Sequence, residues 1–116
     1  MIIRAAVASG VELRDLVMFD EVSSEWIKAS SHAGMIGSII GIDDGATEAI
    51  IQLNSELQAY TSRDIMPHGG RLSVENGRVY VEAENGSMHR FVFPYSGEGL
   101  NENGLVPAGT LVSVCI

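Results

Sequence analysis

The sequence is poor in cysteine, in basic residues and in long hydrophobic runs. Its one cysteine, Cys115, excludes an intramolecular disulfide bond. It has 7 lysines and arginines against 15 aspartates and glutamates, for a formal net charge of -8. A surface of this sign repels phosphate groups, so we expect neither nucleic acid nor an anionic membrane as a partner. No apolar run reaches the roughly 18 residues that a membrane-spanning helix needs.

What the chain does have is enough apolar residues for a core. Its 116 residues are 46% hydrophobic and only 19% charged, unlike the composition of disordered chains. This length corresponds to one domain, which we expect to span residues 1–116. The 13 glycines lack a collagen-like period and indicate many tight turns, as in a β-rich chain. Residues 1–8 are too short a run for a secretory signal, so we expect synthesis in the cytoplasm.

Short apolar runs, each closed by turn residues, divide the first part of the chain. Their length and their content of β-branched and aromatic residues predict strands. The four runs are Ile2–Ala8, Leu16–Phe19, Trp26–Ala29 and Met35–Ile42. Asp43 and Asp44 follow the last run, and they lack the alternating oxygen ligands of a calcium loop, so we interpret them as a solvated turn.

Residues 46–60 fit two patterns. Ala46, Ile50, Leu53, Leu57 and Tyr60 have helical spacing, but the apolar residues also alternate on either side of residues 54–56. The alternation predicts two strands joined by a turn, and a helix is the alternative. We prefer the hairpin because the neighbouring segments are strand-like.

Two Asn-Gly pairs divide residues 71–93. The pairs are Asn76-Gly77 and Asn85-Gly86, and Asn-Gly tolerates the positive φ angles of a tight hairpin turn. The pattern predicts a three-stranded meander, with Val79, Val81 and Ala83 facing inward from its central strand. Residues 94–106 then form a long exposed loop, and Leu111–Ile116 a last strand. About ten short strands with at most one short helix predict a mainly β fold, a small β-barrel or a sandwich.

A search for catalytic or metal-binding motifs finds none. His32, His68 and His89 have no neighbouring ligands in a suitable register, and a metal site needs three or four convergent ones. Cys115 has no partner that would lower its pKa, so we expect it to be a small core residue. We therefore expect no catalytic residues, no metal and no cofactor, and a protein that is not an enzyme. A small barrel that holds one ligand or substrate is a further alternative.

Two aromatic residues are candidates for contact with a partner. Trp26 has the side chain of an interface anchor, although a core position is the more common role for a single tryptophan. Tyr95 lies in the expected 94–106 loop, beside asparagine and glycine residues that suit polar contacts. This loop supports an alternative function, the binding of a glycan on a cell surface.

The order of strands and turns resembles that of phage capsid decoration proteins of the lambda-type head decoration family. Residues 12–17, Glu-Leu-Arg-Asp-Leu-Val, resemble a "G-D-L-V" start, and residues 25–29 resemble the strand that follows it. Residues 34–42 are similar to the glycine-punctuated central strand of that family. Residues 64–67 fill the place of its "D-[IV]-[LM]" step. Residues 107–114 resemble its closing "A-G-T-x-[IV]-S-[IV]" strand.

The resemblance implies a β-tulip or β-clip-like fold and a structural role in the virion. A protein of this kind binds the major capsid protein on the outer surface of the capsid and stabilises the expanded shell. It also binds copies of itself, most commonly as a homotrimer, with a dimer as the alternative. The alternative function is a host-glycan-binding domain of a phage head or tail fibre. Residues 1–10 are then either an N-terminal arm or the first strand. The candidate capsid or subunit contacts are Met1, Ile2, Ile3, Arg4, Val7, Trp26 and Tyr95.

Overall fold

Ten β-strands make up the regular structure of the chain. The computed structural model describes residues 1–82, 86–94 and 99–116, and these contain no helix, so none that could cross a membrane. The mainly β class and the predicted number of strands are confirmed. The strands are β1 (Ile2–Ala6), β2 (Leu16–Asp20), β3 (Glu25–Lys28), β4 (Gly37–Ile42), β5 (Glu48–Gln52), β6 (Glu56–Tyr60), β7 (Gly70–Glu75), β8 (Arg78–Val81), β9 (Phe91–Pro94) and β10 (Leu111–Cys115).

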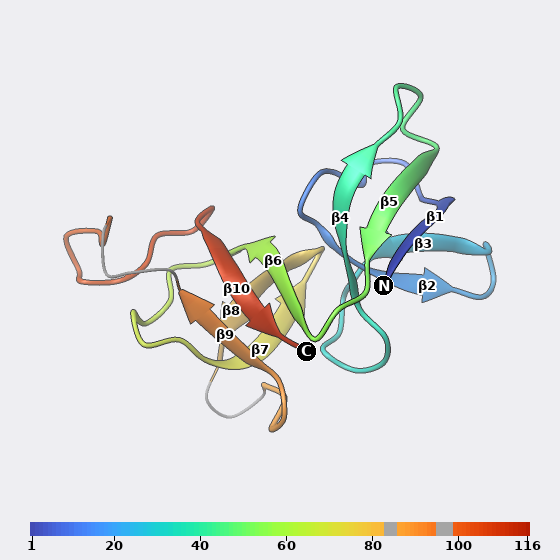
Figure 1. Ribbon diagram of the computed structural model, residues 1–116. Coiled ribbons are helices and arrows are strands. Elements are labelled where there is room, and N and C mark those ends of the chain that lie inside the picture. Colours follow the sequence, from blue (N-terminus) through green and yellow to red (C-terminus); the bar gives the residue numbers. More distant parts are fainter. Residues whose placement is uncertain (83–85, 95–98) are drawn as a thin grey trace.

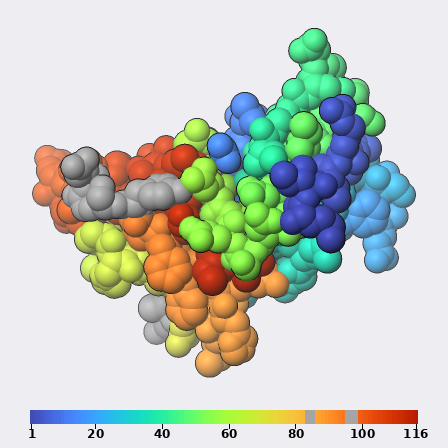
Figure 2. Space-filling model, in the orientation of Figure 1, coloured from blue at the N-terminus to red at the C-terminus, as the bar shows by residue number. Residues whose placement is uncertain are grey.

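The strands form two antiparallel five-stranded sheets, which lie side by side in Figure 1. Residues 1–54, the first half, build a sheet of order β1-β5-β4-β2-β3, and residues 55–116, the second half, build a sheet of order β6-β10-β9-β7-β8. Within the described residues neither sheet is closed into the expected barrel, because its two outer strands are linked by a single isolated bridge. Figure 2 shows the halves as two adjoining lobes, coloured blue to green and green to red.

Residues 46–60 form strands β5 and β6, and the predicted hairpin between them is wrong. β5 pairs with β1 and β4, whereas β6 pairs with β10, so the two strands belong to different sheets. The alternating pattern fixes which side chains share a face of a strand, but it does not fix the partner of that strand. The turn expected at residues 54–56 is the junction of the two halves.

The predicted meander is correct in its first turn and wrong in its second pairing. Asn76 and Gly77 have φ angles of 49° and 81°, and they join β7 to β8 as a tight hairpin. β9, however, pairs with β7 and β10 rather than with β8. The connection between β8 and β9 is long enough to return the chain to the other side of β7. Val79 is buried and Val81 half-buried, as predicted, while Ala83 lies outside the described residues.

The second sheet repeats the topology of the first, strand for strand. Each strand of the first half corresponds to the strand five places later, so β1-β5-β4-β2-β3 becomes β6-β10-β9-β7-β8. The isolated parallel bridges correspond too: Val7 meets Trp26 of β3, and Thr61 meets Val79 of β8. The chain therefore consists of two copies of one five-stranded unit.

The register of the outer strand pair is the same in both halves. Ile3 pairs with Ile51 in the first half, and Leu57 pairs with Val114 at the same place in the second. Hydrogen bonds at the ends of these ladders also recur. Val7 N–H donates to Thr47 O at 3.0 Å, and Thr61 N–H donates to Thr110 O at 2.9 Å. The repeat thus extends from strand order to individual backbone contacts.

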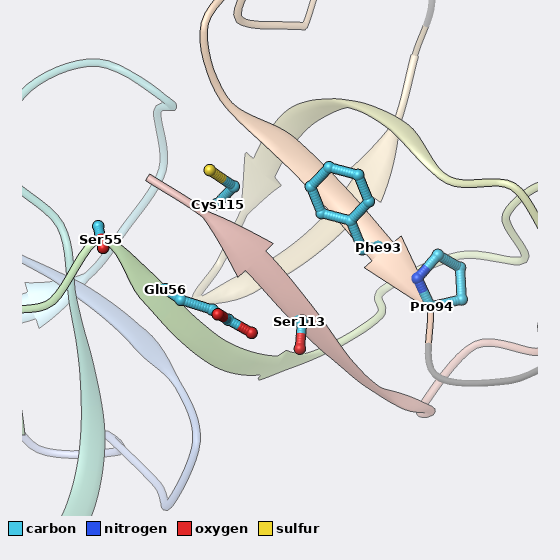
Figure 3. Close-up of a pocket in the computed structure, with 6 residues that line it drawn as sticks. All are labelled: Ser55, Glu56, Phe93, Pro94, Ser113 and Cys115. Atoms are coloured by element: carbon cyan, nitrogen blue, oxygen red, sulfur yellow. The ribbon is translucent and has the colours of Figure 1, made fainter.

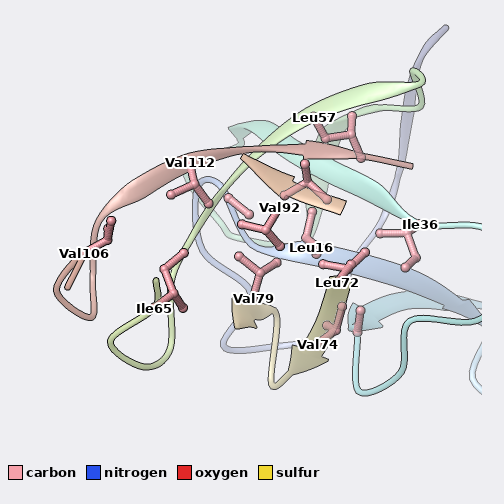
Figure 4. Packing of buried hydrophobic residues seen from close by; sticks show 13 residues of the cluster. Leu16, Ile36, Leu57, Ile65, Leu72, Val74, Val79, Val92, Val106 and Val112 are labelled. Carbon is pink, nitrogen blue, oxygen red and sulfur yellow. The ribbon is translucent and has the colours of Figure 1, made fainter. Parts of the chain in front are cut away.

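The cores of the two halves are not equivalent. One buried cluster is formed by first-half residues alone, and Trp26, Ile39 and Ile51 belong to it. The other cluster, shown in Figure 4, lies mainly within the second half, but Leu16, Ala29 and Ile36 of the first half are part of it. Burying these three side chains across the boundary joins the halves into one packed unit.

Candidate functional site

The outer edge of β1 has a row of unpaired backbone groups. Val7 N–H donates to Thr47 O at 3.0 Å and Leu53 N–H donates to Met1 O at 2.7 Å, so odd-numbered residues of β1 are hydrogen-bonded to β5. In an antiparallel ladder such pairs alternate with non-bonded ones. The amide and carbonyl groups of Ile2 and Arg4 therefore point away from β5, and no strand among the described residues pairs with them. Past Arg4 this edge is closed by the bridge of Val7 to Trp26, where Ala8 N–H donates to Trp26 O at 2.9 Å. An edge of this kind accepts an added strand.

Exposed apolar side chains lie beside this edge. Met1 is 77% exposed and Ile2 is 62% exposed, which is high for side chains of their size. Met1 is held in place because its ammonium group donates to Asn54 Oδ1 at 2.6 Å and to Leu53 O at 3.3 Å. The N-terminus is therefore a fixed part of the surface, next to a strand edge that is ready to pair.

A groove of about 480 Å³ continues from Met1 along the boundary of the two halves. Its apolar lining comes from both halves: Met1, Met35, Ile36, Leu53 and Ile116. Arg90 closes one side, where its guanidinium donates to His32 O at 2.6 Å and to Gly34 O at 2.8 Å. We call Met1, Ile2, Met35, Leu53 and Ile116, together with the β1 edge, the N-terminal face.

The structure brings some of the predicted contact residues to this face and removes others. Met1, Ile2 and Arg4 are exposed and Ile3 is half-buried. All four lie on or next to β1, so residues 1–10 contain the first strand of the fold, which was one of the two alternatives for this segment. Val7 and Trp26 are buried, with 3% and 7% of their surface exposed. They are therefore core residues, because their bridge closes one end of the first sheet and their side chains pack in its cluster. Tyr95 lies outside the described residues.

Cys115 is exposed, so its expected place in the core is wrong. It occupies the outward position of β10, next to the buried Val114. Figure 3 shows it at a shallow pocket of about 350 Å³, together with Ser55, Glu56, Phe93, Pro94 and Ser113. None of the described residues that line this pocket is basic, so none of them favours a thiolate. The pocket offers an exposed aromatic ring, since Phe93 is 50% exposed, rather than an activated nucleophile.

The acidic turn after β4 is a structural turn. Asp43 accepts hydrogen bonds from the backbone N–H groups of Glu48 at 3.2 Å and Thr47 at 2.8 Å, and from the Thr47 hydroxyl at 3.1 Å. These bonds, the one from Glu48 foremost, lower the pKa of Asp43. In the described part of the chain, no three His, Cys, Asp or Glu residues are grouped so that they could hold a metal ion.

Sequence reasoning missed two surface features. One is the turn between β2 and β3, where Val22 is 95% exposed. The other is a groove of about 490 Å³ on the second half, which we call the Gly69 groove. It is lined by Met66, His68, Gly69, Gly70, Arg71, Val81 and Phe91. The sequence signal for both was weak: one apolar residue in a polar turn, and a Gly-Gly pair after a proline.

The surfaces that the structure offers are thus an open strand edge, an apolar face beside it and shallow grooves. Comparison of the chain with models of protein families, with curated proteins and with solved structures gives no match in any of the three.

Proposed function

We propose that this chain is a structural virion protein of a phage head. In this proposal it binds the outer surface of the capsid and stabilises the expanded lattice of the major capsid protein by bridging neighbouring subunits. It performs no catalysis, and its partners are the major capsid protein and copies of itself. The observation that carries the proposal is the open edge of β1 with the exposed apolar residues Met1 and Ile2 beside it.

This edge suits attachment to a β-rich shell protein. An added strand would pair with the outward N–H and C=O groups of Ile2 and Arg4, and backbone pairing supplies affinity. The side chains of Met1 and Ile2 would then be buried against the partner, which stabilises the contact by roughly 25 cal/mol for each Å² of apolar surface covered. Specificity would come from the side chains of the N-terminal face.

Binding only to the expanded lattice would stabilise that lattice by mass action. Many modest contacts on one symmetric shell give strong net attachment when copies are linked, because each bound copy raises the effective concentration of the next contact. The net charge of -8 keeps unbound copies dispersed.

Expanded and unexpanded heads, assembled from the major capsid protein encoded in the same genome, test the proposal. The purified chain is mixed with each, and bound protein is measured after sedimentation of the heads. We expect saturable, symmetric binding to expanded heads and little to unexpanded ones. Ile2→Asp should weaken binding about tenfold or more, since it places a charge in the buried contact.

Leu100→Asp is the matched control, because Leu100 is also an exposed apolar residue but lies in a loop of the second half. It should bind like the wild type. Equal binding of both variants would contradict the role of β1. No binding of the wild type to either form of head, or a genome without a major capsid protein, would overturn the proposed function itself.

A further inference from the structure

The two halves of the chain are joined by a turn that inserts into a backbone gap. The β7–β8 turn of the second half places Gly77 between two residues of the first half. Gly77 N–H donates to Ala29 O at 2.9 Å, and Leu16 N–H donates to Gly77 O at 2.8 Å. Gly77 is buried, and a Cβ atom there would lie 3.2 Å from the Asp15 carboxyl group. The contact is therefore close and specific.

The surface that receives this turn has a counterpart on the second half. In the first half, Asp15 N–H donates to Glu12 O at 3.1 Å. One repeat later, Gly69 N–H donates to Met66 O at 2.9 Å in the same local turn. The Gly69 groove is thus the second-half equivalent of the surface on which Gly77 sits. The counterpart of the Ala29 carbonyl, Glu82 O, accepts from Gly86 N–H at 3.1 Å, so the backbone gap itself is partly occupied. About 490 Å³ is open beside it, next to Gly69, Gly70 and Val81.

The turn that corresponds to the β7–β8 turn is the β2–β3 turn. It covers residues 21–24, all of which are exposed, and Val22 at its tip is 95% exposed. In Figure 1 this turn lies at one end of the molecule, whereas β7 and β9, which border the Gly69 groove, lie in the other half. The turn of one chain is therefore placed to reach the groove of another chain rather than its own.

We infer that a second copy of this chain inserts its β2–β3 turn into the Gly69 groove. The contact uses the counterpart of the surface that the β7–β8 turn occupies within one chain, but it is made mainly by side chains, because Glu82 O is already bonded to Gly86 N–H. Val22 would pack against Met66, Val81 and Phe91, which supply the apolar part of the groove. This inference requires no capsid, so it stands or fails separately from the proposed function.

The charges of the two surfaces are complementary. Asp20, Glu21 and Glu25 flank the β2–β3 turn, and Asp20 also shapes it by accepting from Val22 N–H at 3.1 Å and from the Ser23 hydroxyl at 2.9 Å. The Gly69 groove carries His68 and Arg71. None of the described residues that line the groove is acidic, so the acidic turn meets no like charge there, in a chain with 15 acidic residues.

The contact is heterologous, because turn and groove are different surfaces of the same chain. Such contacts join copies head to tail, and they produce a closed ring or an open filament according to the rotation between neighbours. A two-fold dimer in which each copy inserts its turn into the groove of the other is the smallest closed form of this contact. The number of copies in a ring follows from that rotation.

Two complementary variants test the inference. Val22→Asp blocks the turn and leaves the groove intact, and Met66→Asp blocks the groove and leaves the turn intact. Both are made in a Cys115→Ser background, which excludes disulfide-linked dimers. Sedimentation equilibrium should show oligomers for the unblocked chain and association weakened about tenfold or more for each variant alone. A mixture of the two variants should form dimers with one copy of each variant and nothing larger, because only one intact turn and one intact groove remain in each pair.

The same centrifuge runs include Leu100→Asp, which should assemble like the unblocked chain. Raising the salt concentration should weaken the assembly of the unblocked chain, because salt screens the charges at the contact. Circular dichroism checks that each variant is folded. As a second measurement, Val22→Cys is mixed under oxidising conditions with Met66→Cys, which should give mainly the mixed disulfide. A monomeric unblocked chain at its highest soluble concentration, full assembly of either Asp variant, or mainly same-variant disulfides would overturn the inference.

Discussion

The two halves of this chain have one topology but different surroundings. Each has five strands in the same order, the same outer register and the same bridging contact. Among the described residues, however, the first half contributes three buried side chains to the core of the second, and its own buried cluster contains no second-half residue. Its docking surface is filled by Gly77, whereas the equivalent Gly69 groove is open. The comparison teaches that a repeated unit in a single chain leaves one copy of each contact surface unused.

The largest expected effect comes from the side chains that cross the boundary. Leu16→Ala removes a fully buried leucine and should lower the free energy of unfolding by about 2–5 kcal/mol. The neighbouring Val17 is equally buried but belongs to the cluster of the first half. Chemical denaturation measures both losses, and methyl NMR shows where each cavity lies.

The comparison predicts that Leu16→Ala shifts mainly methyl signals of the second half, such as Leu57 and Val92. Val17→Ala should shift mainly those of the first half, such as Ile39 and Ile51. If both variants shifted the same methyl signals, the assignment of Leu16 and Val17 to different buried clusters would be wrong.

A smaller effect is expected at the inserted turn. Gly77 has a φ angle of 81°, and Gly10 has one of 88°, so alanine is strained by roughly 1–2 kcal/mol at either position. A Cβ atom at Gly10 meets nothing within 4 Å, whereas at Gly77 it crowds Asp15. Gly77→Ala should therefore destabilise the protein more than Gly10→Ala in the same denaturation experiment. Equal losses would show that the insertion contributes no close packing.

The carboxyl group under that turn should make stability depend on pH. Asp15 is 5% exposed, and burial raises its pKa above the usual 3.8, against the lowering effect of its hydrogen bond with Glu12 N–H and of Lys28. Because the folded-state pKa is the higher one, this group's contribution to stability is present below pH 3.8 and is lost as the pH rises through the folded-state pKa. Asp15→Asn should remove this loss.

Thermal unfolding from pH 3 to 7 checks the sign, with Asp43→Asn as the comparison. Asp43 is exposed and has a lowered pKa, so its contribution is present above pH 3.8 and is lost as the pH falls. The two variants should therefore change the pH profile in opposite directions. Changes of the same sign would contradict the burial of Asp15.

The smallest effect should come from an ion pair confined to the second half. Arg63 Nε and Nη2 donate to the Glu75 carboxylate at 2.8 and 2.9 Å, and the guanidinium stacks 3.9 Å from the Tyr80 ring centre. Arg63 lowers the pKa of Glu75 to about 2. Since both side chains are largely solvated, Arg63→Ala should cost at most about 1 kcal/mol near neutral pH.

That cost should shrink as the pH falls from 4.5, the usual Glu pKa, toward 2, because protonation of Glu75 removes the pair's contribution. High salt should reduce it as well. A cost that is independent of both pH and salt would point to lost packing on Tyr80 instead.

Local patterns in the sequence were sufficient for the strands and insufficient for their partners. Alternation and turn residues place β1 to β10 close to their observed positions, and Asn76-Gly77 forms the expected tight turn. Pairing is set by contacts between distant segments, so β5 and β6 were joined in one hairpin and β9 was placed next to β8. A strand that pairs with its neighbour along the chain and a strand that pairs with a distant one have the same local pattern.

The repeat was invisible because the two halves share a backbone and hardly any side chains. Over the matched outer strands, Ile3 corresponds to Leu57 and Arg4 to Gln58, and among the first-strand pairs only Ala5 and Ala59 are identical. Burial alternates in the same phase along both strands, although the second-half strand is the more deeply buried, so the fold is retained while identity is lost. Of the candidate site, the sequence identified Met1 and Ile2 from an apolar N-terminal run. It could not identify the Gly69 groove, which depends on tertiary structure.

The central claim, that this chain fastens to a phage head through the β1 edge, is tested most directly by an image reconstruction of expanded heads incubated with the protein. The account predicts symmetric density on the outer surface, resolved well enough to show β1 continued by a strand of the major capsid protein. Expanded heads that carry no added density, or bound copies whose β1 edge faces solvent, would contradict it.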